Sequence, residues 1–162
     1  MCTACRYSHA RDRMTLPMMG RVWSFDSAWD LMAMSQYGTI TLAEIDAQVK
    51  QLGQELGADV ECFQTNFEGD MVEKIHKAHT DGIDAVMINA GAWTHYNYGI
   101  RDALAILKCP IIEVHMSNIH AREAFRHQSV IAEIAKGQFA GFGVDSYLLG
   151  LRAAISAVQT KA

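Results

Sequence analysis

The chain has 162 residues, of which 50% are hydrophobic and 20% are charged, and its formal net charge is −4. This balance is typical of a soluble globular protein with one domain, and no apolar run is long enough to cross a membrane. The acidic balance, with no basic stripe in the body of the chain, argues against nucleic acid as the main partner.

The N-terminal segment has a composition different from the rest of the chain. Residues 1–13 are basic, but no apolar stretch follows them, so we expect no signal peptide. We expect residues 1–17 to form a disordered tail and residues 18–162 to form a single domain.

Four cysteines bear on metal binding and location. Cys2 and Cys5 form a C-x-x-C pair with His9 nearby, but no second pair of zinc ligands follows at a defined spacing. We interpret this pair as free thiols, and Cys62 and Cys109 as small core residues because their neighbours are apolar. Since nothing requires an oxidising compartment, we expect a cytoplasmic protein.

After residue 40, the spacing of apolar residues predicts helices that alternate with strands. Thr41 and Glu44 have the capping-box spacing at the start of the first helix, which Gly57 can close. Gly82 can close the second helix, and Asp145 is expected to cap the last. In chain order we expect helix 42–56, strand 60–65, helix 71–82, strand 85–88, helix 98–107, strand 111–114, a weaker strand 139–142 and helix 145–158.

This alternation predicts a parallel sheet with right-handed crossovers. Four strands follow residue 58, and a flavodoxin-like sheet needs a fifth that precedes the first helix and lies centrally. Residues 14–29 are the only candidate, in which Val22, Trp23 and Phe25 can serve. The expected fold is therefore α/β, a flavodoxin-like three-layer sandwich with a five-stranded parallel sheet whose first strand is atypical.

Polar residues gather where two predicted strands end. Asn89 follows one apolar strand directly, and His115, Ser117 and Asn118 follow the next strand along the chain. In sheets of this kind, ligands bind at the carboxyl ends of the strands. The sequence therefore predicts a functional site at this edge.

Two segments, residues 88–104 and 113–129, carry most of the side chains suited to chemistry. Histidine is a natural general acid or base, and arginine can grip a carboxylate with two parallel hydrogen bonds. For any one residue we favour a structural polar network, but for the whole set we favour a functional site. The spacing fits no compact metal-ligand pattern, and no phosphate-binding loop follows a strand. The set comprises His95, His115, His120, His127, Arg101, Arg122 and Arg126.

The same segments resemble a known enzyme family. The motif HMSNIHAREAFRH at residues 115–127 is highly specific, and NAGA at 89–92, followed by Thr94-His95 and RDAL at 101–104, is nearly as specific. Together with QTNFEG at 64–69, these motifs resemble the type II 3-dehydroquinate dehydratases. The resemblance covers about three quarters of the chain, from Tyr37-Gly38 to the last helix.

This resemblance implies a lyase of the shikimate pathway that converts 3-dehydroquinate to 3-dehydroshikimate without a metal or a cofactor. In that family a tyrosinate removes a proton next to the ketone, an enolate forms, and a histidine protonates the departing hydroxyl. By resemblance, Tyr37 matches the base and His115 the acid. A tyrosine has an ordinary pKa of about 10, so such a base needs a nearby cation.

The resemblance also implies roles for residues around this pair. Members of the family assemble as trimers grouped into a dodecamer, which implies a homo-oligomer whose other partner is the small-molecule substrate. The matched residues are Asn89, His95, Ser117, the backbone at Met116 and Arg126 as substrate contacts, Glu113, His120 and Arg122 as supporting residues, and Asp102 as a residue that reaches a neighbouring subunit's site.

The residues before Tyr37 depart from the family. The loop arginine that activates the tyrosine falls at Met32, and the asparagine near the enolate falls at about Phe25. Two functions therefore stay open: a dehydratase, with full or impaired activity, or a non-catalytic or defective relative that binds a cyclic hydroxy acid. A reading-frame shift upstream of Tyr37, or a misassigned start, is the hypothesis for this departure. The gene sequence tests it, because another frame must then encode the family's Gly-Pro-Asn strand. The sequence leaves open a biosynthetic or a quinate-degrading role.

Overall fold

The computed structural model of the chain describes residues 20–26 and 40–160. Its strands form one sheet in the order β2-β1-β3-β4-β5, in which every neighbouring pair is parallel. The elements are β1 (Arg21–Asp26), α2 (Leu42–Glu55), β2 (Asp59–Gln64), α3 (Glu68–Asp81), β3 (Ala85–Asn89), the 3-10 turn η1 (Gly91–His95), α4 (Tyr98–Ala105), β4 (Ile111–His115), the 3-10 turns η2 (Ile119–Ala121) and η3 (Ala124–His127), β5 (Gly137–Ala140) and α5 (Asp145–Gln159).

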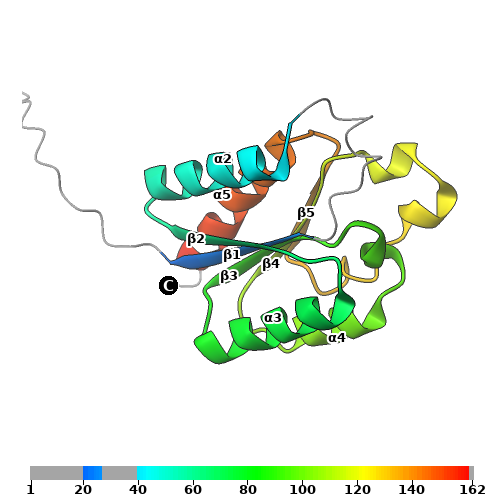
Figure 1. Cartoon of the computed structure of the whole chain (residues 1–162), viewed down its shortest axis with the longest axis horizontal. Coiled ribbons are helices and arrows are strands. Elements are labelled where there is room, and N and C mark those ends of the chain that lie inside the picture. The colour runs from blue at the N-terminus through cyan, green and yellow to red at the C-terminus, as the bar shows by residue number, and fades with distance from the viewer. Residues whose placement is uncertain (1–19, 27–39, 161–162) are drawn as a thin grey trace, which may run out of the picture.

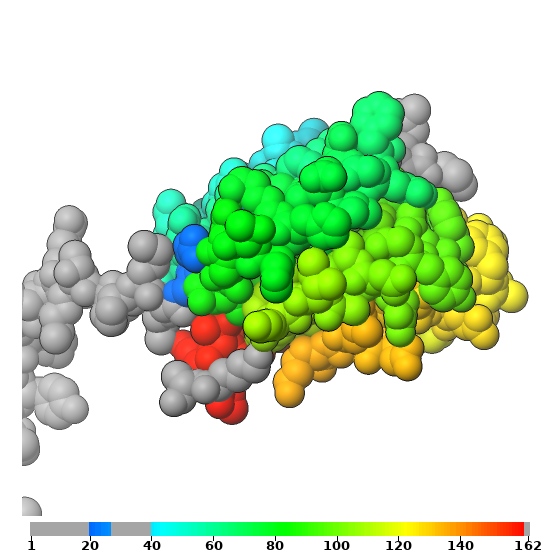
Figure 2. Space-filling model, turned by 90° about the horizontal axis from the view of Figure 1, so that it is seen from below, coloured from blue at the N-terminus to red at the C-terminus, as the bar shows by residue number. Residues whose placement is uncertain are grey.

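Helices cover the sheet on both faces. The pair α2 and α5 lies on one face, and α3 and α4 lie on the other (Figure 1). Figure 2 shows the molecule from the side on which α3 and α4 lie, drawn in green and yellow-green. Each helical layer packs on its own buried apolar cluster. This arrangement confirms the prediction of a flavodoxin-like α/β sandwich with a five-stranded parallel sheet.

The atypical first strand is real and lies inside the sheet. β1 pairs with β2 on one side and with β3 on the other. Val22 faces the α2–α5 cluster, whereas Trp23 and Phe25 face the α3–α4 cluster, as strand geometry requires. Ser24 and Asp26 are buried polar residues, and they make the strand hard to read from its hydrophobic pattern.

Helix ends follow the predicted signals with one exception. The capping box is confirmed, because the Thr41 backbone N–H donates to Oε2 of Glu44 at 2.7 Å and the Glu44 backbone N–H donates to Oγ1 of Thr41 at 3.3 Å. Gly82 ends α3 in the left-handed conformation, with φ of 62°. The prediction that Asp145 caps α5 is wrong: Val144 is the cap residue, and Asp145 is the first residue of the helix. There its charge lies at the positive end of the helix dipole.

Two further expectations need correction. The last strand is Gly137–Ala140 rather than 139–142, because Gly141 turns the chain with φ of 95°. Cys62 and Cys109 are only half-buried, so they lie at the margin of the core clusters rather than within them.

Several predictions fall outside the described residues. They concern the tail at residues 1–17 and its two cysteines, Met32, and Tyr37. Among the residues that the structure describes, none of the helices is long and apolar enough to span a membrane.

Candidate active site

Three central strands end at the same edge of the sheet and deliver polar side chains there. Asp26 ends β1, Asn89 ends β3 and His115 ends β4. The register pairs Asp26 with Asn89, and Ile88 with Glu113. The short turns η1, η2 and η3 follow these strand ends, and the η2–η3 segment is drawn in yellow in Figure 1.

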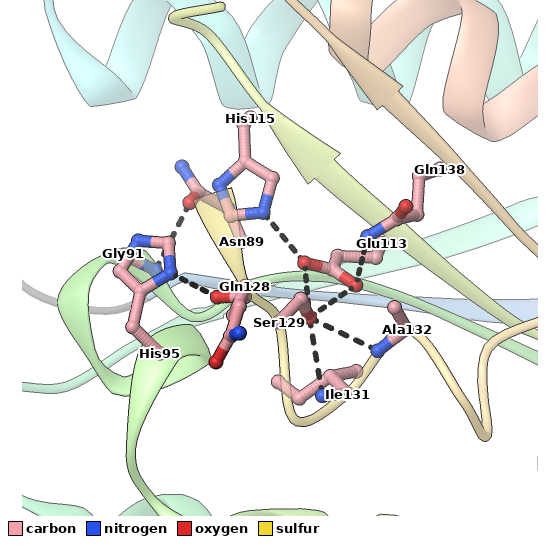
Figure 3. A network of polar contacts seen from close by, with 10 residues as sticks. All are labelled: Asn89, Gly91, His95, Glu113, His115, Gln128, Ser129, Ile131, Ala132 and Gln138. Carbon is pink, nitrogen blue, oxygen red and sulfur yellow. Dashed lines mark hydrogen bonds and ion pairs between the residues drawn. The ribbon is translucent and has the colours of Figure 1, made fainter. Parts of the chain in front are cut away.

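Glu113 and His115 form the buried centre of the site (Figure 3). They are two residues apart on β4, so their side chains lie on the same face of the strand. The His115 Nε2 lies 2.7 Å from Oε1 of Glu113, and Glu113 is completely buried. A carboxylate that holds one imidazole nitrogen fixes the orientation of the ring. The Nδ1 of His115 is then the ring atom left for a ligand.

Glu113 is itself held by two further donors. Ser129 Oγ lies 2.9 Å from Oε1 of Glu113, and Gln138 Nε2 donates to Oε2 at 2.7 Å. Ser129 Oγ accepts from the backbone N–H groups of Ile131 and Ala132, at 3.1 and 3.0 Å, so its own proton goes to Glu113. Glu113 thus acts only as an acceptor, and His115 Nε2 donates to it.

The His95 ring lies next to the His115 ring. Their rings are stacked, with centroids 6.4 Å apart and planes 15° from parallel. The His95 Nδ1 lies 2.7 Å from the carbonyl oxygen of Gln128, which can only accept, so Nδ1 donates. Burial lowers the pKa of His95, and the nearby His115 and Arg126 lower it further. A neutral His95 ring therefore presents Nε2 as an acceptor.

Asn89 links the sheet edge to η1. Its Oδ1 accepts from the Gly91 backbone N–H at 3.1 Å, and its Nδ2 donates to the hydroxyl of Tyr147 on α5 at 2.7 Å. Tyr147 in turn donates to Oδ1 of Asp26 at 2.6 Å. Asn89 is thus fixed at both ends of its amide.

The η3 segment adds an aromatic and a cationic side chain. Phe125 packs its ring edge-on to His95, with centroids 5.8 Å apart. Arg126 lies over the Phe125 ring at 4.8 Å and donates from Nε to Glu123 at 2.7 Å. The predicted contact Arg126 is therefore connected to His95 through Phe125.

Two predicted contacts follow His115 directly. Met116 is buried and its carbonyl oxygen accepts from the Gly143 N–H at 3.0 Å. Ser117 is half-buried and comes next along the chain. Both therefore lie at the same sheet edge as His115.

Other predicted residues lie apart from this centre. The His120 ring lies 5.8 Å from that of His127, and Arg122 pairs with Glu123 at 3.5 Å. Within the described part of the chain, no hydrogen bond or ion pair joins His120 or Arg122 to Glu113 or His115. Their supporting roles stay predictions.

Asp102 lies on the outside of α4. Its side chain is 73% exposed and pairs at 3.1 Å with Arg101, which also reaches Glu133 at 3.0 Å. The structure therefore does not bring Asp102 into contact with the cluster around Glu113 and His115.

Sequence reasoning missed four residues of the site. Asp26 had a usable signal, because it directly follows Phe25, one of the apolar residues expected to serve in the atypical first strand. Ser129, Gln138 and Tyr147 had none, since each reaches the site from a distant part of the chain.

Across residues 20–26 and 40–160, no group of three or more His, Cys, Asp or Glu side chains is arranged to hold a metal ion. The predicted site residues instead form hydrogen-bonded pairs and ring contacts.

Comparison with known proteins finds similarity to one enzyme family. The family model for dehydroquinase class II matches residues 32–155. The 3-dehydroquinate dehydratase of Leptothrix cholodnii is 76% identical over 124 residues, covering 76% of this chain and 83% of the relative. The 3-dehydroquinate dehydratase of Syntrophotalea carbinolica is 66% identical over 127 residues, covering 78% of this chain and 86% of the relative.

Solved structures extend the similarity. The type II dehydroquinase from Propionibacterium acnes superposes with a TM-score of 0.81 at 39% identity, covering 87% of this chain and 99% of that one. The type II dehydroquinase from Butyrivibrio crossotus superposes with a TM-score of 0.79 at 33% identity, covering 83% of this chain and 97% of that one. The residues matched by the family model include the cluster around Glu113 and His115 but begin after β1.

Proposed function

The chain belongs to the dehydroquinase class II family, and from this premise we propose that it eliminates water from 3-dehydroquinate to give 3-dehydroshikimate. In this hydro-lyase reaction, a base removes a proton from the carbon next to the ketone, and an enolate forms. The C–O bond of the neighbouring hydroxyl then breaks, and the hydroxyl leaves as water. The observation that carries the proposal is the buried His115–Glu113 pair at the carboxyl edge of the sheet.

His115 is the group that protonates the departing hydroxyl. Its Nε2 is held by Glu113, so its Nδ1 can carry the proton that the leaving hydroxyl needs. The two further donors to Glu113, Ser129 and Gln138, keep this carboxylate fixed as the ring changes protonation. A preorganised acid of this kind needs no movement at the moment of reaction.

The substrate's hydroxyl groups and carboxylate are bound by residues around this pair. A neutral His95 accepts from a substrate hydroxyl through Nε2, and Asn89 lies at the same edge of the sheet. Ser117 and the backbone at Met116 add donors beside His115. Arg126 is suited to the anionic side of the substrate.

Tyr37 is the base in this scheme, by its match to the family motif. The support for reduced turnover comes from Phe25, because an ungapped continuation of the resemblance puts the family's enolate asparagine at about this position. Phe25 is fully buried and packs edge-on against Trp23 and Phe63, on the α3–α4 face of the sheet. It offers the enolate no hydrogen bond. We therefore propose a turnover below that of the relatives, and binding of a cyclic hydroxy acid without turnover is the second candidate function.

The proposed assembly rests on the resemblance to the family. We propose a homo-oligomer of trimers grouped into a dodecamer, in which the exposed Asp102 reaches a neighbouring subunit's site. We also propose a cytoplasmic location, because nothing in the sequence requires an oxidising compartment. Light scattering of the purified protein tests the assembly, and a monomer would contradict it.

One pair of experiments separates the two functions. Calorimetric titration with 3-dehydroquinate measures binding, and absorbance of the conjugated enone measures turnover. Binding with turnover supports the dehydratase, and binding without turnover supports the second candidate. A folded protein that does neither contradicts both.

A further inference from the structure

A second polar cluster lies beneath the site, on the other face of the sheet from Glu113 and His115. Asp26 is only 3% exposed at the end of β1, where it faces α5. It accepts from the Tyr147 hydroxyl at 2.6 Å, and Tyr147 accepts from Nδ2 of Asn89 at 2.7 Å. Asp26 and Asn89 are also register partners on neighbouring strands.

The donors and acceptors in this cluster can be assigned one by one. The Asn89 Nδ2 can only donate, so the Tyr147 oxygen accepts from it. The single proton of Tyr147 then goes to Asp26. At the other end, the Gly91 N–H donates to Oδ1 of Asn89. The bonds therefore run in one direction, from η1 through Asn89 and Tyr147 to Asp26.

Asp26 is the acceptor that ends this series. The groups that face it are Tyr147 of α5, Asn89 of β3 and Asp46 of α2, and Asp46 in turn contacts Cys62 of β2. No ion pair to a described basic side chain balances its charge. An apolar residue here would cost less to bury than a carboxyl group. Packing alone therefore does not account for an acid at this position.

We propose that Asp26 is a positioning residue of the active site: through Tyr147 it fixes the Asn89 amide and the start of η1, which carries His95. This inference rests on the proposed function of the site, since Asn89 and His95 are there the substrate contacts. The ring of Tyr147 is buried among apolar residues of the α2–α5 cluster, so α5 stays packed without the hydroxyl contact. The hydrogen bond between Tyr147 and Asp26 therefore orients the Tyr147 hydroxyl and, through it, the Asn89 amide.

Two substitutions at the same position separate positioning from burial. In Asp26→Asn, the amide oxygen still accepts from Tyr147, whereas in Asp26→Leu the acceptor is gone. Ser24→Ala is the matched control. Ser24 lies two residues before Asp26 on the same face of β1, and it is only 2% exposed. The full-length protein is used throughout.

The first readout does not depend on turnover. Hydrogen–deuterium exchange is followed by mass spectrometry on peptides that span residues 89–97. Loss of one hydrogen bond corresponds to about a fivefold change in a local opening equilibrium. We expect Asp26→Leu to exchange about fivefold or more faster there, whereas Asp26→Asn and Ser24→Ala stay near wild type. Unchanged exchange in Asp26→Leu overturns the proposal, whether or not the protein is a dehydratase.

The second readout is a double-mutant cycle on kcat/KM. If Asp26 acts through Asn89, Asp26→Leu lowers kcat/KM by about ten- to a hundredfold in the native background. The same change lowers it by less than about twofold in an Asn89→Ala background. Equal losses in both backgrounds mean a general loss of stability and overturn the proposal. Absence of turnover in the wild-type protein instead overturns the proposed function, and the exchange readout then decides on Asp26 alone.

Discussion

His115 and Glu113 are joined by a 2.7 Å hydrogen bond between side chains two residues apart on one strand. Because both lie on the same face of β4, the strand itself sets their spacing. The acid proposed for the dehydration is therefore oriented by rigid secondary structure rather than by a loop.

The first prediction removes the charge of Glu113 while keeping its shape. Glu113→Gln replaces one acceptor oxygen with an amide that cannot accept from all three donors, so His115 loses its fixed orientation. We expect kcat to fall by about a hundredfold, as for other orienting partners, with the fold retained. Steady-state kinetics measure this. Glu55→Gln, an exposed change on α2, is the control and keeps kcat. Equal kcat in both variants would contradict the role of Glu113.

The second prediction concerns Ser129, which connects Glu113 to the following loop. Ser129→Ala leaves the N–H groups of Ile131 and Ala132 without their acceptor and removes one donor from Glu113. We expect the free energy of unfolding to fall by about 1–3 kcal/mol and kcat to fall less than in Glu113→Gln. Urea unfolding and steady-state kinetics measure the two effects. An unfolding midpoint equal to that of wild type would show that the loop does not need this hydroxyl.

The third prediction compares two helical glycines. A Cβ at Gly150 on α5 would lie 2.5 Å from Val114 Cγ1 and 2.9 Å from Met87 Sδ, whereas a Cβ at Gly69 on α3 meets nothing within 4 Å. Gly150→Ala should therefore destabilise the protein by about 1–3 kcal/mol through overpacking. Gly69→Ala should stabilise it by about 0.5–1 kcal/mol through helix propensity. Thermal unfolding compares them, and a stable Gly150→Ala variant would mean that α5 does not pack this closely.

The fourth prediction is a dependence of stability on pH. The pKa of Asp26 is raised to about 7, chiefly by burial and in smaller part by the charge of Asp46, while the hydrogen bond from Tyr147 opposes this rise. In the unfolded chain this pKa is about 3.9. Between these two values the folded state holds a proton that the unfolded state has lost. The free energy of unfolding therefore falls as pH rises through this window, by on the order of 4 kcal/mol at most.

Asp26→Asn removes this titration. Urea unfolding at pH 5 and pH 8 should show a larger loss of stability with rising pH in wild type than in Asp26→Asn. Asp59→Asn is the control, because Asp59 is exposed and begins β2, whereas Asp26 pairs with Gln64 at the other end of that strand. This variant should keep the pH dependence of the wild-type protein. The same pH dependence in wild type and Asp26→Asn would place the titration elsewhere.

Much of this fold and part of the site could be predicted from the sequence. The alternation of apolar runs predicts the strands and helices, and the topological rule for parallel sheets then places Asn89 and His115 at one edge. The spacing of Glu113 and His115 on a strand already places them on the same face. The capping box of Thr41 and Glu44 is a local pattern, and local patterns transfer well to structure.

The rest depends on contacts between distant parts of the chain. Ser129 and Gln138 reach Glu113 from 16 and 25 residues away, which requires the loop path and the register of β5. The contact of Tyr147 with Asp26 spans 121 residues. Asp145 misleads because an acid stabilises a helix both as the cap residue and in the first turn, so its presence does not fix where the helix begins.

The most direct test of the account follows enone absorbance after 3-dehydroquinate is added to wild type, His115→Asn and His79→Asn. His79 is exposed on α3, far along the chain from the site, and serves as the control. We predict turnover in wild type and in His79→Asn, and a loss of about a hundredfold or more in His115→Asn. Turnover in His115→Asn equal to that of wild type would contradict the assignment of the acid. A folded wild-type protein without turnover would contradict the dehydratase itself.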